Sequence, residues 1–122
     1  MLVRDVKDCT EIIAGDKTIL REVLHPSSSD VHIGYSIAQA TVQVGGTSAP
    51  HQMKTSEVYY ILEGAGRMSI NEEHQEVSTG QAIYIPPNAI QYIKNTGEHD
   101  LVFLCIVDPA WKPEDEIILD NK

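Results

Sequence analysis

Two stretches of this chain decide its fold: GGTSAPHQMKTSEVYYILEG at residues 45–64 and GQAIYIPPNAIQYIKN at residues 80–95. Each opens with glycine, which adopts the positive φ of tight turns at little cost, and then runs into β-branched and aromatic residues that favour strands. Successive strand residues face opposite sides, so Glu57, Tyr59 and Ile61 share one face. We predict that this face lines the interior of a β-structure.

Short β-rich segments continue on both sides of these stretches and are separated by Gly, Pro and Asn, which predicts an all-β sandwich or barrel. The expected strands are residues 18–24, 35–44, 57–62, 67–70, 76–77, 82–85, 90–93 and 101–107. The last of these, LVFLCIV, is apolar on both faces, which predicts a central strand buried from both sides or covered by a partner subunit.

A length of 122 residues indicates a single domain over residues 1–122. We expect the barrel core at about residues 12–111 and a C-terminal tail at residues 112–122. The apolar residues 117–119 of the tail are expected to dock on the barrel or on a partner. The tail's acidic residues, and those of the turn at residues 71–76, are expected to form a solvated surface.

The net charge of −9 disfavours nucleic acid and anionic membranes as partners, because both are bound through Lys and Arg. No apolar run approaches the roughly 20 residues that span a bilayer, and the N-terminus lacks the apolar core of a signal peptide. Cys9 and Cys105 form neither a disulfide framework nor a metal-type cluster. The composition therefore predicts a cytoplasmic protein.

The two quoted stretches resemble the two signature motifs of the cupin superfamily, and the likeness to small single-domain cupins extends from about residue 12 to about residue 111. The matching positions are Gly45, His51, Glu57 and Gly64 in the first motif, and Gly80, Pro86 and Asn95 in the second. The resemblance implies a jelly-roll barrel that binds a small molecule. It also implies a homodimer formed through residues 18–24 and the strand at 101–107.

The cupin pattern places three histidines and a glutamate around a metal, whereas this chain has Met53 and Gln91 at two of the histidine positions. The resemblance implies a metal site of His51, Glu57, Gln91 and Met53, with Zn, Ni, Mn or Fe as the divalent ion. An amide oxygen and a thioether are weak ligands for these ions. The alternative is that His51 and Glu57 are remnants and Met53 fills an apolar gap.

Without a metal, Glu57 inside an apolar barrel must be either protonated or paired with His51. A His51–Glu57 pair would form a general acid/base couple, and we expect these two residues and Tyr59 as the catalytic candidates. The hydroxyls of Tyr35 and Tyr84 are further candidates for the same pocket, with core packing as the alternative.

The resemblance implies a metal-assisted isomerase, epimerase or lyase acting on a small polar or sugar-like molecule in the barrel mouth. Dioxygen chemistry is disfavoured because two imidazole ligands are missing. The alternative is a non-catalytic binding or sensor module without a metal, and a structural dimer is the third reading. One barrel supports many functions, so the fold does not choose among them.

Overall fold

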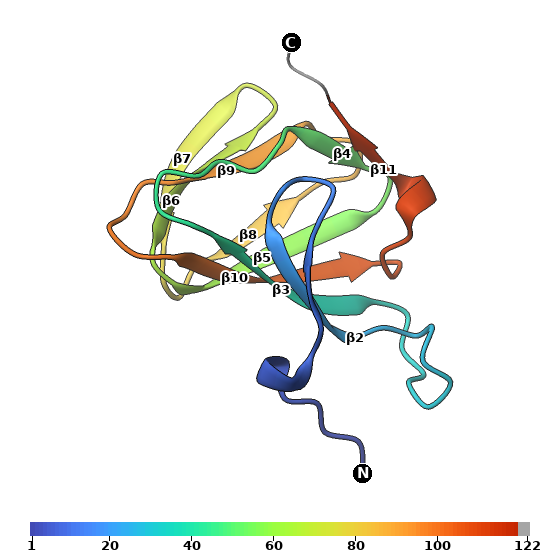
Figure 1. Cartoon of the computed structure of the whole chain (residues 1–122). Coiled ribbons are helices and arrows are strands. Elements are labelled where there is room, and N and C mark those ends of the chain that lie inside the picture. The colour runs from blue at the N-terminus through green and yellow to red at the C-terminus, as the bar shows by residue number, and fades with distance from the viewer. Residues whose placement is uncertain (120–122) are drawn as a thin grey trace.

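The computed structural model describes residues 1–119 as two antiparallel β-sheets that face one another (Figure 1). The six-stranded sheet has the order β1 (Glu11–Ile13), β2 (Ile19–Leu24), β3 (Ser36–Val42), β10 (Leu101–Asp108), β5 (Ser56–Glu63) and β8 (Ala82–Ile85). The five-stranded sheet has the order β11 (Glu116–Ile118), β4 (His51–Met53), β9 (Gln91–Asn95), β6 (Ala65–Ile70) and β7 (Glu73–Ser78).

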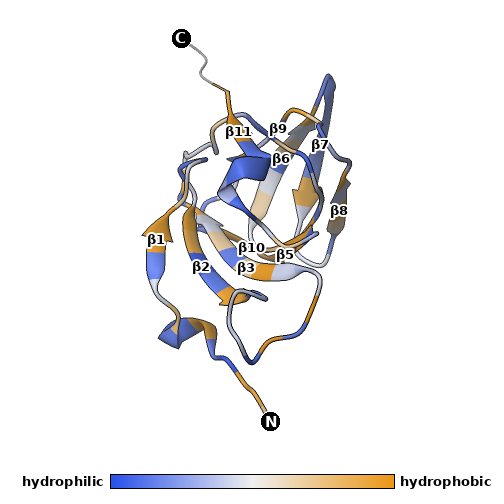
Figure 2. Cartoon of the chain, turned by 90° about the vertical axis from the view of Figure 1, so that its right-hand side faces the viewer, coloured by the Kyte–Doolittle hydropathy of each residue, from blue (hydrophilic) through white to orange (hydrophobic). Residues whose placement is uncertain are grey.

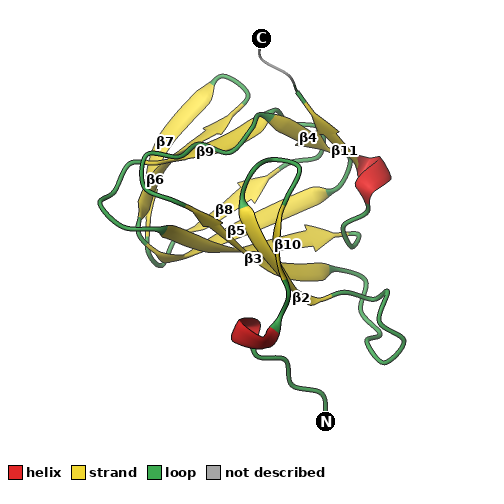
Figure 3. Cartoon of the chain, in the orientation of Figure 1, coloured by secondary structure: helices red, strands yellow, loops and turns green. Residues whose placement is uncertain are grey.

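Helical structure in the described part of the chain is limited to two short 3-10 turns, η1 (Val6–Asp8) and η2 (Pro113–Asp115) (Figure 3). No helix within residues 1–119 has the length and apolar character needed to cross a membrane. The all-β barrel predicted from the strand pattern is therefore confirmed.

The core lies between the two sheets, and β10 is its central element (Figure 2). Burial alternates along β10, with Leu101 and Phe103 fully buried on the inner face and the outer-face residues half-buried. The ring of Phe103 lies 4.4 Å from that of Tyr59 on β5, centroid to centroid, a separation typical of attractive aromatic pairs. The strand predicted at residues 101–107 is therefore present at the centre of its sheet, but it is not buried from both sides, since only its inner face is fully buried.

Three strands were not among those predicted, namely β4, which lies inside the five-stranded sheet, and β1 and β11. Both β1 and β11 are three-residue edge strands, and each exists because it pairs with a neighbour rather than because of its own pattern. The strand expected at residues 76–77 is also longer, since β7 pairs with β6 along its whole length after a turn at Asn71, which has a φ of 54°.

Gly66 on β6 lies close to both the neighbouring strand β9 and strand β10 of the other sheet. A Cβ atom at this position would lie 2.8 Å from Leu101 Cδ2 on β10 and 2.8 Å from the Lys94 carbonyl oxygen on β9. The second contact is with backbone, which cannot move without disturbing the β6–β9 ladder. The absence of a side chain at Gly66 therefore sets the spacing at this end of the barrel.

We expect Gly66→Ala to lower the free energy of unfolding by about 1–3 kcal/mol, the usual cost of overpacking a core. Urea denaturation measures this change. Gly34→Ala is the control, because a Cβ there meets no atom within 4 Å and the change should be small. Equal stability of the two variants would contradict the packing argument.

Candidate functional site

A cavity of about 510 Å³ opens between the sheets at the end where β4 and β11 lie opposite β3, β5 and β10. His51, Met53, Glu57 and Tyr59 all line this cavity. Gln91 does not reach its surface, because it is fully buried behind these residues. The structure therefore brings four of the five sequence-predicted site residues to one space and places the fifth directly behind them.

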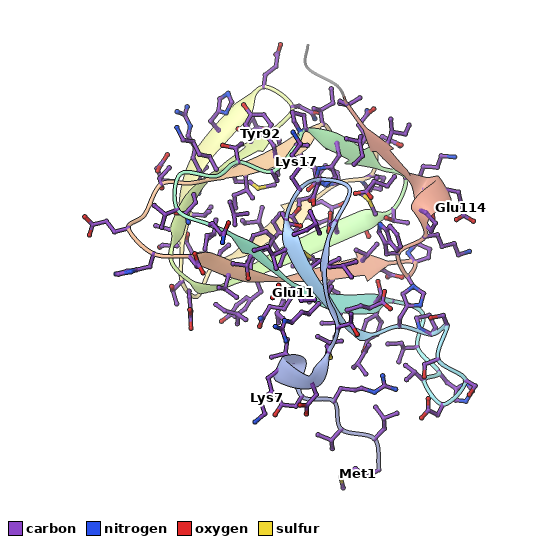
Figure 4. All side chains as sticks on the ribbon, in the orientation of Figure 1. Met1, Lys7, Glu11, Lys17, Tyr92 and Glu114 are labelled. Atoms are coloured by element: carbon purple, nitrogen blue, oxygen red, sulfur yellow. The ribbon has the colours of Figure 1, made fainter. Side chains whose placement is uncertain are left out.

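The charged side chains of the cavity wall are predominantly acidic. Four carboxyl groups line it, from Asp16, Glu22, Glu57 and Glu116. Within residues 1–119, no Lys or Arg side chain lines the same space. Even Lys17, at the tip of the β1–β2 hairpin in Figure 4, stays outside the lining. The ionisable groups that a bound molecule meets are therefore these carboxyl groups and one imidazole, set in a wall that is otherwise mainly apolar, with Leu20, Val107 and Trp111 among its residues.

A chain of two hydrogen bonds joins the sheets in the interior. The Tyr59 hydroxyl on β5 donates to Gln91 Oε1 on β9 over 3.0 Å, and Gln91 Nε2 donates to Glu57 Oε1 on β5 over 3.1 Å. Tyr59 and Glu57 share the inner face of β5, as their spacing predicts. The amide at Gln91 serves as acceptor and donor at once, which satisfies all three buried groups.

Glu57 is held as a neutral acid. Its burial raises the pKa of the carboxyl to about 8, an effect opposed by the Gln91 hydrogen bond and reinforced by Asp16 and Glu116. Among the described residues, Gln91 is its one hydrogen-bond partner, and the bond uses only Oε1. Oε2 therefore remains available to a molecule in the cavity.

His51 does not pair with Glu57, so this part of the prediction was wrong. No ion pair or hydrogen bond joins the two side chains among the residues that the structure describes. The reason is the backbone carbonyl of Ala49, which lies 2.9 Å from His51 Nδ1 and turns the ring away. Nε2 instead faces Asp16 Oδ2 at 3.8 Å and Glu116 Oε2 at 4.0 Å.

Asp16 reaches His51 because the β1–β2 hairpin folds over the cavity toward β4 (Figure 1). The Asp16 carbonyl accepts a hydrogen bond from Ala49 N over 2.7 Å, which fastens the hairpin tip beside β4. Its side-chain Oδ1 accepts from Thr18 N and from Thr18 Oγ1 at 3.1 and 2.7 Å. Oδ2 is left pointing at the imidazole. The sequence signal was limited to the turn at Gly15-Asp16.

Glu116 arrives from the other end of the chain, on β11. This strand pairs antiparallel with β4, with Glu116 opposite Met53 and Ile118 opposite His51. Burial raises the pKa of Glu116; Asp16 adds to this rise and His51 opposes it. The expectation that the tail's acidic residues form a solvated surface was therefore wrong for Glu116, because strand pairing turns this carboxylate inward.

The family's metal-ligand positions do not fit a divalent ion in this chain. Gln91 offers N–H donors toward Glu57 while its oxygen accepts from Tyr59. The Glu57 carboxyl is already engaged through Oε1 by the Gln91 amide, which presents N–H groups to it in place of a third imidazole. Within residues 1–119, no group of three or more His, Cys, Asp or Glu side chains is arranged to hold a metal ion. Met53 is buried and packs as an apolar residue.

Two further tyrosines lie elsewhere. The side chains of Tyr35 and Tyr84 are 40% and 63% exposed, and neither lines the cavity. Tyr84 falls on the outer face of β8, because the strand alternation turns Ile83 and Ile85 inward. Tyr59 is therefore the one of these three tyrosines that lines the cavity, and its hydroxyl is engaged by Gln91.

Comparison with known proteins points to one family. The family model described as Cupin domain matches residues 38–107. The chain is similar to an uncharacterized protein of Methanocaldococcus jannaschii, with 42% identity over 88% of this chain and 86% of that one. The chain is also 28% identical to the mannose-1-phosphate guanylyltransferase ManC of Salmonella typhimurium. This match covers 95% of the chain described here but only 26% of the length of ManC.

A solved structure gives the same picture for the fold. The polyketide cyclase RemF from Streptomyces resistomycificus superposes with a TM-score of 0.82 at 19% identity, over 100% of this chain and 87% of that one. At this identity the likeness establishes the barrel and says nothing about the reaction.

The raised pKa of Glu57 predicts how stability depends on pH. Folding shifts this pKa from an ordinary 4.5 to about 8, so the fold favours the neutral form. The loss of folding free energy is absent below about pH 4.5, grows as the pH rises, and is complete above about pH 8, where it reaches on the order of 5 kcal/mol. We expect Glu57→Gln to remove this loss of stability between pH 5 and pH 9.

Urea denaturation across this pH range measures the effect in the wild type and in Glu57→Gln. Glu63→Gln is the control, because it removes an exposed carboxylate from the same strand. Parallel pH dependences of the wild type and Glu57→Gln would show that Glu57 ionises freely in the folded protein.

Proposed function

Since this chain belongs to the cupin family, we propose that it binds a small, hydroxyl-rich molecule without negative charge in the cavity between its sheets. The observation that carries the proposal is the wall of four carboxyl groups with no Lys or Arg in the described lining. A phosphate or carboxylate entering this space would lose its hydration without gaining a cationic partner, which is unfavourable. Neutral hydroxyls can donate to the carboxyl oxygens.

A sugar is the class of molecule that suits the cavity. The volume of about 510 Å³ lies in the range of small-molecule sites. The similarity to ManC, whose name refers to mannose 1-phosphate, supports a sugar-like ligand. The acidic wall argues that the sugar bound here carries no phosphate.

We further propose an isomerase, epimerase or lyase reaction in which the neutral Glu57 carboxyl donates its proton to an oxygen of the bound molecule while His51 Nε2 accepts the proton that leaves a neighbouring carbon. Oε2 of Glu57 is free toward the cavity, and the neutral carboxyl can donate. His51 Nε2 lines the same cavity and provides a second proton-transfer group. Tyr59 acts through Gln91, which holds the Glu57 carboxyl in position. The donor set of this chain supports proton transfer better than metal-assisted chemistry.

We expect neutral D-mannose to bind at least tenfold more tightly than mannose 1-phosphate, because only the phosphate is repelled by the wall. Calorimetry and NMR titration of the purified protein measure both affinities. Ala38→Phe, which fills the cavity, should abolish binding. Gln39→Phe, one residue further along β3, should not. Tighter binding of the phosphate would overturn the proposal.

The proposed proton transfer is tested separately from ligand binding, by hydrogen exchange. Incubation of the bound sugar in D₂O should exchange carbon-bound hydrogen for deuterium, and Glu57→Gln should abolish the exchange while the sugar still binds. Binding without exchange in the wild type would identify a binding module and reject the enzymatic reading.

We also propose that the protein forms a homodimer through the free edge of β1. Ile12 and Ile13 on this edge strand are 49% and 69% exposed. A second copy pairing there would satisfy the free backbone N–H and C=O groups of the edge and bring apolar side chains of the two copies together, and an apolar unpaired edge is otherwise an aggregation hazard. Light scattering at micromolar concentration should give twice the monomer mass. Ile13→Lys should give the monomer mass, and a monomeric wild type would contradict this interface.

A further inference from the structure

We propose that the ligand of this cavity carries an apolar substituent, which binds on a strip of apolar side chains beside the carboxyl groups. This inference rests on the proposed function and narrows it, since it makes the ligand a sugar-like molecule with an alkyl or aryl group attached. The apolar strip consists of Ile12, Leu20, Ala38, Val107 and Trp111, all of which line the cavity. None of the five stands at a position that the cupin pattern assigns to the metal site.

The strand register sets the order of polar and apolar groups across the floor of the cavity. Ser36 on β3 lies opposite Val107 on β10, and Val107 lies opposite Glu57 on β5. Directly opposite residues of antiparallel strands share one face of the sheet, and all three side chains line the cavity. The floor therefore changes from a carboxyl group to an aliphatic side chain within the distance of one strand.

The apolar floor continues across β3, β2 and β1. Ala38 lies opposite Cys105 on β10, and Ala40, two residues further along the same face of β3, lies opposite Leu20 on β2. Leu20 in turn lies opposite Ile12 on β1. Ala40 is buried in the core, and the other four line the cavity. The floor thus extends in one direction from the acid, as a row of small and aliphatic side chains.

This part of the floor stays open to solvent. β1 and β2 form the outer edge of the six-stranded sheet (Figure 2). Ile12 is 49% exposed, and Leu20 and Ala38 are only partly buried although they pack against the core. Glu22, opposite Ala38, is exposed, which leaves its charge in water. Covering this apolar surface with an apolar group of the ligand is favourable, because it removes both from water.

Trp111 forms an apolar wall of the same cavity and is held at three points. Its backbone N–H donates to Ser36 Oγ over 3.0 Å, and its carbonyl oxygen lies 2.7 Å from His25 Nε2. Its indole N–H donates to the Glu116 carboxyl group. Because the polar atom of the indole is occupied, the surface that it offers to a ligand is carbon. The wall is fixed before a ligand arrives, which lowers the cost of binding.

The dimensions suit a sugar ring joined to a second group. Neighbouring strands lie about 4.8 Å apart, so along the sheet β3 lies roughly 10 Å and β2 roughly 14 Å from Glu57 on β5. A sugar ring beside Glu57 therefore ends before it reaches Leu20. A cavity of about 150 Å³ is sufficient for benzene, so a space of about 510 Å³ accommodates a hexose together with a group of several carbon atoms.

The test compares methyl, butyl and hexyl α-D-mannopyranoside below their micellar concentrations, by calorimetry and by the fluorescence of Trp111, the single tryptophan of the chain. Each buried CH₂ should strengthen binding about threefold, so we expect butyl mannoside to bind at least tenfold more tightly than methyl mannoside and to shift the emission to the blue. Leu20→Asn should reduce this gain to less than threefold without weakening methyl mannoside. Ile19→Asn, the matched change on the outer face of β2, should keep the gain.

Competition with 1-hexanol needs only the wild type. Hexanol should weaken the binding of hexyl mannoside and leave methyl mannoside unaffected, because it occupies the apolar strip alone. A saturable shift of the Trp111 emission with hexanol, absent in Ala38→Phe, supports the strip even if no mannoside binds, in which case only the proposed sugar ligand fails. Measurable but equal affinities for methyl and hexyl mannoside would overturn the strip and leave sugar binding standing. A Trp111 emission that hexanol does not change would overturn the strip as well.

Discussion

The hydrogen-bond chain from Tyr59 through Gln91 to Glu57 is the constraint on which the interior depends. It crosses from the six-stranded sheet to the five-stranded sheet and back, and every group in it is deeply buried. Because an amide donates and accepts at the same time, it pairs a phenol with a carboxyl and leaves neither unsatisfied. It also leaves one carboxyl oxygen free, so the bonds that tie the sheets together also prepare the acid at the base of the cavity.

The same hydrogen bonds, from Tyr59 through Gln91 to Glu57, explain why this protein departs from the cupin pattern at two histidine positions. Gln91, the middle residue of this series of hydrogen bonds, stands where the cupin pattern has a histidine. Met53 stands at a second histidine position and lies buried beside the cavity. The two changes convert a ligand set into a hydrogen-bonded wall with an apolar filler. The charged groups that face one another therefore lie at the mouth of the cavity. There His51 faces the carboxylates of Asp16 and Glu116, and it does not share a metal ion with Glu57.

Much of the fold could be predicted from the sequence because its signals are local. Strand alternation identified the inward face of β5, and the two-faced apolar run identified the central β10. The role of Asp16 could not be predicted, because it depends on a backbone hydrogen bond to Ala49, 33 residues along the chain. The position of Glu116 at the cavity could not be predicted for a similar reason, because a charged tail gives no local sign that it will pair with β4. The orientation of His51 was missed because a carbonyl sets it.

The mouth of the cavity is made by the two ends of the chain, with the β1–β2 hairpin on one side and β11 on the other. The barrel core lies almost wholly between them. Selection can therefore act on recognition and on folding separately. Substitutions near position 16 or position 116 change the lining of the cavity mouth and leave the residues of the core cluster in place. Divergence within this architecture is easiest at the termini, where sequence comparison is usually given the least weight.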